Sequence, residues 1–167
     1  MAEGDGSLDQ LLFSIRFILD APFDFTATDN RSLLTKVRLL AASAKYFNGL
    51  AVSLFGGRLG SVREEGLVEQ VVGAAFQTFD GVDPHPTPFE KAAMLLRGIT
   101  QGHPFTDGNK RTGFLLAAYF LRQTGIPLPD PLNVALAESL CLRVSAGEIR
   151  DINVIAAELR ALWRDFN

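Results

Sequence analysis

The chain has 167 residues, of which 47% are hydrophobic and 21% charged, and its formal net charge is −3. This length and apolar content suit one domain with an ordinary buried core that needs neither a metal nor disulfides. The single cysteine, Cys141, excludes an internal disulfide framework and reads as a small core residue rather than a catalytic thiol. The negative charge argues against a broad surface for nucleic-acid phosphates, so any anion that the protein binds should be small.

The sequence carries neither the pattern of a secretory leader nor an apolar run of the roughly 20 residues that a membrane span requires. A reducing, cytoplasmic setting is therefore expected. No internal repeat, low-complexity tract or linker divides the chain. Residues 1–167 are expected to form a single domain.

Apolar residues at helical intervals predict three helices in the first half of the chain. They cover about residues 7–20, about Asn30 to Leu54, and about residues 64–75. The segment 77–88 follows, rich in glycine and proline. Its central Asp80-Gly81 predicts a turn or a short hairpin.

Two strongly apolar helices are predicted next. The first covers Phe89 to Thr100 and is opened by Thr87-Pro88-Phe89-Glu90, which supplies an N-cap hydroxyl, a first-turn proline and a capping glutamate. The second ends at Gly125. Because both are apolar nearly all round, we expect them to form a central hairpin surrounded by other helices. Two more helices, Asp130 to about Ser145 and about 152–163, complete an all-α fold.

The loop between the two apolar helices reads HPFTDGNKRTG, residues 103–113. Gly108 can adopt backbone angles closed to other residues, and the N–H groups of Gly108, Asn109, Lys110 and Arg111 lead into a helix start, which favours an anion. Lys110 and Arg111 add full positive charges, and arginine can hold a phosphate through two bonds. The loop therefore predicts a site for a phosphate chain.

Two further side chains of the loop complete the chemistry. Asp107 would repel a phosphate unless it binds a Mg²⁺ ion that bridges to the phosphate oxygens. His103 stands four residues earlier, and an imidazole that titrates near neutral pH can take a proton from an attacking hydroxyl. A held phosphate, a metal and a base are the parts required for transfer from a nucleotide to an alcohol.

Structural interpretations of the same residues remain open. His103 can be a helix cap or a packed ring, Asp107 and Asn109 can be the caps of a common turn, and the two cations can be a solvated pair. A phosphate loop of the Walker type is excluded, because Asp107 stands where that motif requires its second glycine. The only other histidine, His85, lies in a proline-rich loop and reads as a surface residue.

The loop resembles the signature of the Fic and Doc superfamily, H-x-F-x-D/E-G-N-x-R, and matches every fixed position. The resemblance extends over about residues 45–128, where GGRLGSVREEGLVEQ and QTGIPL also look like the death-on-curing (Doc) branch. It implies a Fic/Doc helical bundle in which His103 is the base, Asp107 the Mg²⁺ ligand, and residues 108–111 the phosphate site.

The resemblance also implies that the turn segment is a β-hairpin flap, which registers a target peptide beside the site by adding a strand to it. The interpretation without the family is a plain connecting loop. The flap residues are Phe76, Gln77, Thr78, Phe79, Asp80, Gly81, Val82 and Asp83.

One position distinguishes the reactions known in the family. Most nucleotide-transferring members have glycine after the motif asparagine, whereas this chain has Lys110, as Doc-like members do. The resemblance therefore implies a toxin with an antitoxin partner that uses Mg²⁺ and ATP to phosphorylate a Ser or Thr hydroxyl of a target protein. The alternatives are adenylylation by the same site, or a non-catalytic module that binds a nucleotide or a partner.

A second spacing concerns inhibition. Ser61 and Glu65, followed by Gly66, match the S/T-x-x-x-E-G/N pattern by which a glutamate blocks the nucleotide site in some relatives. The alternative interpretation is an ordinary helix start, because R-E-E-G-L also looks like the R-D-E-G-L segment of Doc relatives.

Overall fold

The computed structural model of the protein describes residues 30–55 and 62–164, and of the side chains those from residue 33 onward. The described ranges contain helices and no named strand, which confirms the all-α expectation. The helix predicted over residues 7–20, and Ser61, lie outside them. The helices are α2 (Asn30–Phe55), α3 (Leu67–Ala74), α4 (Pro88–Gly102), α5 (Asn109–Gln123), α6 (Val134–Ser145) and α7 (Ile152–Arg164).

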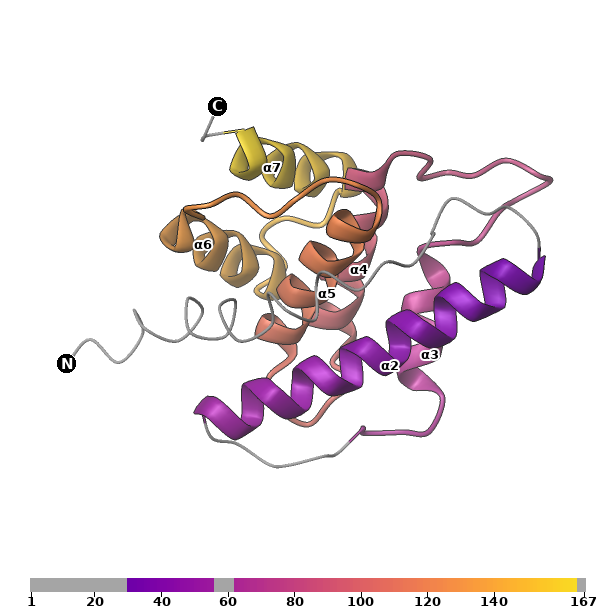
Figure 1. Ribbon diagram of the computed structural model, residues 1–167, viewed down its shortest axis with the longest axis horizontal. Helices are drawn as coiled ribbons and strands as arrows, with labels where there is room; N and C mark the ends of the chain where they lie inside the picture. The colour runs from indigo at the N-terminus through magenta and orange to yellow at the C-terminus, as the bar shows by residue number, and fades with distance from the viewer. Residues whose placement is uncertain (1–29, 56–61, 165–167) are drawn as a thin grey trace.

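The predicted central hairpin is formed by α4 and α5 (Figure 1). Helix α2 crosses on one side of it and packs against α5, with α3 lying against both α2 and α4, while α6 and α7 cover the other side. Every residue from 112 to 121 in α5 is buried. The continuous apolar run of this helix is thus explained by neighbours on all sides.

Gly113 explains how closely the two hairpin helices approach. A Cβ atom at this position would lie 2.9 Å from Cγ2 of Thr100 and 3.2 Å from the carbonyl oxygen of Leu96. The backbone of α5 therefore rests directly on α4. Because protein interiors are closely packed, this contact gives the loop between the helices a rigid base.

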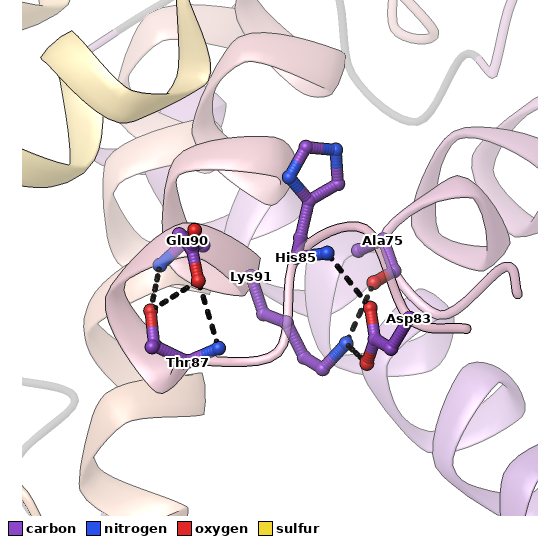
Figure 2. A network of polar contacts seen from close by, with 6 residues as sticks. All are labelled: Ala75, Asp83, His85, Thr87, Glu90 and Lys91. Carbon is purple, nitrogen blue, oxygen red and sulfur yellow. Dashed lines mark hydrogen bonds and ion pairs between the residues drawn. The ribbon is translucent and has the colours of Figure 1, made fainter.

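The start of α4 is fixed by the predicted capping box (Figure 2). The hydroxyl of Thr87 accepts a hydrogen bond from Glu90 N at 3.3 Å, and Oε2 of Glu90 accepts one from Thr87 N at 2.9 Å. Pro88 fills the first helical position. Such a cap contributes about 1 kcal/mol and places the beginning of the hairpin at a defined residue.

Two predicted helix starts are corrected. Helix α6 begins at Val134 rather than Asp130, because the side chain of Asn133 caps it by accepting a hydrogen bond from Leu136 N at 3.1 Å. Helix α3 begins at Leu67 rather than near residue 64, since Gly66 precedes it in a left-handed conformation. The residues before Gly66 contact the motif loop instead of continuing the helix.

The flap, residues 76–83, is a tight two-residue turn. Phe79 and Val82 exchange two backbone hydrogen bonds of 2.9 Å, and the residues between them, Asp80 and Gly81, have positive φ angles of 50° and 77°. This is the conformation that an Asp-Gly pair favours in hairpins. The hairpin ladder expected for the flap is not confirmed, because the pairing is a single isolated bridge.

Candidate active site

His103 ends α4 in a left-handed conformation, with φ 46° and ψ 55°. Its backbone N–H donates to Ile99 O at 3.2 Å, and its side chain is exposed. A left-handed conformation costs a residue with a Cβ atom roughly 1–2 kcal/mol, so surrounding contacts have to hold it. The imidazole is thereby presented at the surface from a fixed backbone.

The segment before α3 supplies those contacts. Arg63 donates its backbone N–H to Pro104 O at 2.9 Å and its guanidinium Nη1 to His103 O at 3.1 Å. Val62 and Phe105 form an antiparallel bridge beside them. The three residues that open the motif are therefore held by a neighbouring strand-like segment. Sequence reasoning missed Arg63, because this segment was considered for its inhibitory spacing, as a helix start and for its family resemblance, but not as a support of the motif loop.

The side chain of Asn109 closes the loop internally. Its Nδ2 donates to Phe105 O at 2.9 Å, and its Oδ1 accepts from Phe105 N at 3.1 Å. Both residues are buried. The amide side chain is therefore occupied by the backbone of the loop, and what Asn109 leaves for an anion is its backbone N–H.

Asn48 joins the loop to α2. Its Nδ2 donates to Asp107 O at 2.6 Å and to the hydroxyl of Thr112 at 3.2 Å. Gly108 has φ 74°, and a Cβ atom there would lie 3.1 Å from Asn48 Nδ2. Gly108 is thus required both by its backbone angle and by its neighbour. Asn48 gave no signal in the sequence, because it is one polar residue in a long amphipathic helix.

The first turn of α5 has no side-chain cap among the described residues. It holds Asn109, Lys110 and Arg111 and contains no acidic residue. The first N–H groups of a helix have no partner within it, and the helix dipole is positive there. Lys110 is exposed. An anion site formed by these groups stays a prediction.

Asp107 stands exposed at the edge of the same turn. Its Oδ1 accepts from Gly108 N at 2.8 Å. Among the residues that the structure describes, its Oδ2 has no partner, and those residues contain no group of three or more acidic, histidine or cysteine side chains arranged around a metal. A metal at Asp107 would have to take its other ligands from water or a bound molecule.

Arg111 lies over the ring of Phe55, the last residue of α2, with 4.4 Å between the guanidinium carbon and the ring centroid. Such a cation–π contact restrains the guanidinium without using its N–H groups. Glu65 is exposed, and the described contacts include no ion pair between it and Arg111. The inhibitory role of Ser61 and Glu65 stays a prediction.

One pocket of about 540 Å³ collects the motif residues. Residues of α6 also line the pocket. Sequence reasoning missed them, because nothing in that helix indicates chemistry. The lining residues of the loop and α5 are His103, Thr106, Asp107, Gly108, Asn109, Lys110, Arg111 and Phe114. Those of α6 are Glu138, Cys141, Leu142 and Ser145.

Cys141 is buried in α6, in agreement with the core role expected for it. Burial, together with the smaller effect of the neighbouring charge of Glu138, raises the pKa of its thiol to about 12. The thiol therefore stays protonated at neutral pH and is a poor nucleophile. The part of the pocket wall that it forms is chemically inert.

No helix within residues 30–55 and 62–164 is both long and apolar enough to cross a membrane.

His85, expected at the surface, is half-buried, and its backbone N–H donates to Asp83 Oδ1 at 2.8 Å. It lies outside the pocket lining. Of the two histidines, only His103 therefore lines the pocket.

Comparison with known proteins identifies the family. Residues 33–121 match the family described as Fic/DOC. Toxin Doc of Mycolicibacterium smegmatis is 40% identical over 105 residues, which are 63% of this chain and 79% of the relative. Protein kinase doc of Escherichia phage P1 is 31% identical over 112 residues, 67% of this chain and 84% of the relative.

A third relative matches over a shorter stretch. A Fido domain-containing protein of Dictyostelium discoideum is 35% identical over 69 residues, 40% of this chain and 48% of the relative. The region shared with the family contains the whole motif loop, all of α4, and α5 up to residue 121. With its helical bundle and its pocket built on that loop, the chain belongs to the Fic/DOC family.

Proposed function

We propose that this protein is a Doc-like toxin that transfers the γ-phosphoryl group of ATP, with Mg²⁺, to a Ser or Thr hydroxyl of a target protein. The observation that carries the proposal is the single pocket shared by a histidine, a carboxylate and the basic first turn of α5. Phosphoryl transfer needs mainly positioning and charge stabilisation, and these residue types supply both.

The phosphate chain binds at the start of α5. Its backbone N–H groups and the charges of Lys110 and Arg111 attract the phosphate oxygens. The contact with Phe55 keeps the guanidinium of Arg111 ordered before the ligand arrives, which lowers the entropy lost on binding. Glu138 of α6 also lines the pocket and would repel phosphates. The phosphate chain of the nucleotide therefore lies against the motif loop and the start of α5.

Asp107 fits a Mg²⁺ ion. Its Oδ2 has no partner among the described residues, and Mg²⁺ commonly binds one or two carboxylates together with phosphate oxygens and water. A bound ion would neutralise charge on the phosphates as the bond to the leaving group breaks. The hydrogen bond from Gly108 N keeps the carboxylate of Asp107 oriented at the mouth of the pocket.

His103 is the general base. The target hydroxyl oxygen forms a bond to the γ-phosphorus, the bond from that phosphorus to its bridging oxygen breaks, and ADP leaves. The hydroxyl proton passes to a ring nitrogen of His103 and then to solvent. The exposed imidazole suits this exchange with solvent.

Lys110 supports phosphorylation over adenylylation. Its side chain lines the pocket and occupies space that a glycine would leave to the outer phosphates of a nucleotide held for AMP transfer. The relative named Protein kinase doc supports the same choice. Adenylylation, in which the α-phosphorus is attacked and pyrophosphate leaves, is the alternative.

A target peptide pairs with the flap, residues 76–83, by adding a strand to it. Phe79 and Val82 are each 65% exposed at its tip, where they offer apolar contacts. The relative named Toxin Doc supports a toxic activity that an antitoxin protein restrains. The partners are therefore ATP, a target protein and an antitoxin.

The test uses ATP labelled at either the α or the γ phosphate, with Mg²⁺, in a bacterial lysate. We expect protein labelling from the γ position alone, lost in His103→Ala and kept in His85→Ala, which removes the other histidine. Label from the α position would establish adenylylation. A His103→Ala variant as active as the parent would overturn the role of His103 as the base. No labelling by the parent while it binds ATP would support the non-catalytic module.

A further inference from the structure

Helix α6 presents one of its faces to the pocket. Glu138, Cys141, Leu142 and Ser145 line the pocket, and residues three, four and seven positions apart lie on the same side of a helix. The volume of about 540 Å³ lies in the range of pockets that take up a whole small-molecule ligand. The face of α6 is therefore available to the part of a nucleotide that extends beyond its phosphates.

Glu138 is the acidic residue on this face of α6. Its side chain is half-buried, and within residues 33–55 and 62–164 no hydrogen bond or ion pair engages its carboxylate. A carboxylate that is partly withdrawn from water is unfavourable unless it finds hydrogen-bond donors. The carboxylate of Glu138 therefore remains available to a bound molecule.

Glu138 lies close to the expected phosphate site without belonging to it. The charges of Glu138 on α6 and of Lys110 on α5 both act on the buried thiol of Cys141, where Glu138 raises the pKa and Lys110 lowers it. Both side chains therefore flank the same part of the pocket wall. When the phosphates lie at the start of α5, the ribose is the group next to them that can reach α6.

The chemistry of a carboxylate selects among the parts of a nucleotide. An ionised carboxylate only accepts hydrogen bonds, so Glu138 repels phosphate oxygens and attracts groups that donate. The ribose offers two adjacent hydroxyls, one for each oxygen of a carboxylate, whereas adenine offers a single exocyclic amine farther from the phosphates. An acidic side chain that binds a ribose hydroxyl also serves dinucleotide-binding proteins. The ribose is therefore the better partner for Glu138 in both the number and the position of its donors.

We propose that Glu138 binds the ribose of the nucleotide by accepting hydrogen bonds from its 2′ and 3′ hydroxyls, and that the pocket thereby selects nucleotides whose sugar keeps both. The proposal rests on the proposed function, because it takes the phosphates to lie at the start of α5. Glu138 contacts the sugar and not the reacting phosphorus. It is therefore a specificity residue, and its removal changes which nucleotide binds.

The first experiment measures the binding of ATP and of 2′,3′-dideoxy-ATP, each with Mg²⁺, to the purified protein by calorimetry. We expect the parent to bind ATP about tenfold more tightly than the dideoxy nucleotide, and Glu138→Ala to bind the two within about twofold of each other. The matched control is Glu148→Ala, which removes an exposed carboxylate outside the pocket lining and should keep the preference. Equal binding of the two nucleotides by the parent, or a preference that survives in Glu138→Ala, would overturn the proposal.

Inorganic triphosphate separates a contact with the ribose from a general effect on the pocket. It carries the anionic part of the ligand alone, so Glu138→Ala should bind it at least as tightly as the parent does, because a repelling charge is removed. ATP binding by the same variant should weaken about fivefold, since the loss of the ribose contacts exceeds that gain. A parallel weakening for ATP and triphosphate would assign Glu138 a structural role and overturn the proposal. Glu138→Gln, which keeps the shape and one acceptor oxygen, should retain part of the preference for ATP over the dideoxy nucleotide.

Inosine triphosphate tests the alternative, a contact between Glu138 and the base, because its base lacks the exocyclic amine of adenine. We expect the ratio of the affinities for ATP and inosine triphosphate to be the same in the parent and in Glu138→Ala. A ratio that changes, with the dideoxy preference unaffected, would place Glu138 at the base and overturn its assignment to the ribose.

The binding data and the transfer assay together separate this proposal from the proposed function. If the parent prefers ATP over the dideoxy nucleotide through Glu138 but transfers no γ label in the lysate, the proposed function fails and the ribose contact stands. If the parent transfers γ label but binds the two nucleotides equally, the proposed function stands and the role of Glu138 fails. If the parent binds neither ATP nor triphosphate, both fail.

Discussion

Arg63 donates a guanidinium hydrogen bond to the carbonyl oxygen of His103 at 3.1 Å and a backbone hydrogen bond to Pro104 O at 2.9 Å. His103 has a left-handed backbone conformation, which is unfavourable for a residue with a Cβ atom. Contacts around the loop therefore have to hold it. The side chain of Arg63 thus acts on the orientation of the imidazole without touching a substrate.

We expect Arg63→Ala to lower the saturating rate of label transfer about tenfold, since small misplacements of a catalytic group cost this much or more. ATP affinity should stay within about twofold, because Arg63 does not line the pocket. Transfer and binding assays measure the two effects. Arg38→Ala, at an exposed position of α2, serves as the control. A parallel loss of ATP binding in Arg63→Ala would contradict the assignment.

Gly108→Ala should destabilise the protein and weaken phosphate binding. The added Cβ atom meets Asn48 Nδ2 at 3.1 Å, and the residue keeps φ 74°. We expect the free energy of unfolding to fall by roughly 1–3 kcal/mol, as measured by denaturant titration. Gly125→Ala has a similar backbone strain, φ 91°, but no atom within 4 Å of the added Cβ. A loss in Gly108→Ala no larger than in Gly125→Ala would show that Asn48 does not crowd the site.

Asn109→Ala tests whether the motif asparagine is structural. The substitution leaves both backbone groups of the buried Phe105 without their partner. Each unpaired buried group costs roughly 1–3 kcal/mol, so we expect a large decrease in the free energy of unfolding. Asn133→Ala, which removes the cap of α6, should cost only about 1 kcal/mol. Equal decreases in the free energy of unfolding in the two variants would argue that the two hydrogen bonds between Asn109 and Phe105 do not stabilise the loop.

The sequence predicted most of the fold because the helices carry strong local signals. The capping box of Thr87 and Glu90 predicts the start of α4. The long apolar run after Arg111 predicts a helix that is buried on all sides. The start of α6 was misplaced because Asp130-Pro131 and Asn133 both resemble caps, and only the side-chain bond of Asn133 decides between them.

The site was predictable only where its residues are adjacent in the chain. His103 to Arg111 form one motif, and His103 and residues 106–111 line one pocket. Arg63, Asn48 and Lys91 reach the loop or the flap from other elements, through contacts with backbone carbonyl oxygens. Such contacts leave no pattern in the sequence, because every residue has a carbonyl group and the partner is selected by the tertiary fold.

The ion pair of Lys91 and Asp83 predicts a pH dependence of stability. Although burial opposes it, the bonds from Lys91 and His85 N place the pKa of Asp83 below its ordinary value of 3.8. A carboxylate whose pKa is lowered by folding stabilises the protein above the unfolded pKa, and this contribution is lost as the pH falls through the folded value. We therefore expect Asp83→Asn to lower the free energy of unfolding near neutral pH and to flatten its decline below about pH 4, measured by denaturant titration.

In Glu158→Gln the matching change should be smaller, because that carboxylate is 38% exposed beside Arg143 and water screens the pair. An Asp83→Asn profile parallel to that of the parent at every pH would mean that Lys91 and Asp83 do not interact in solution.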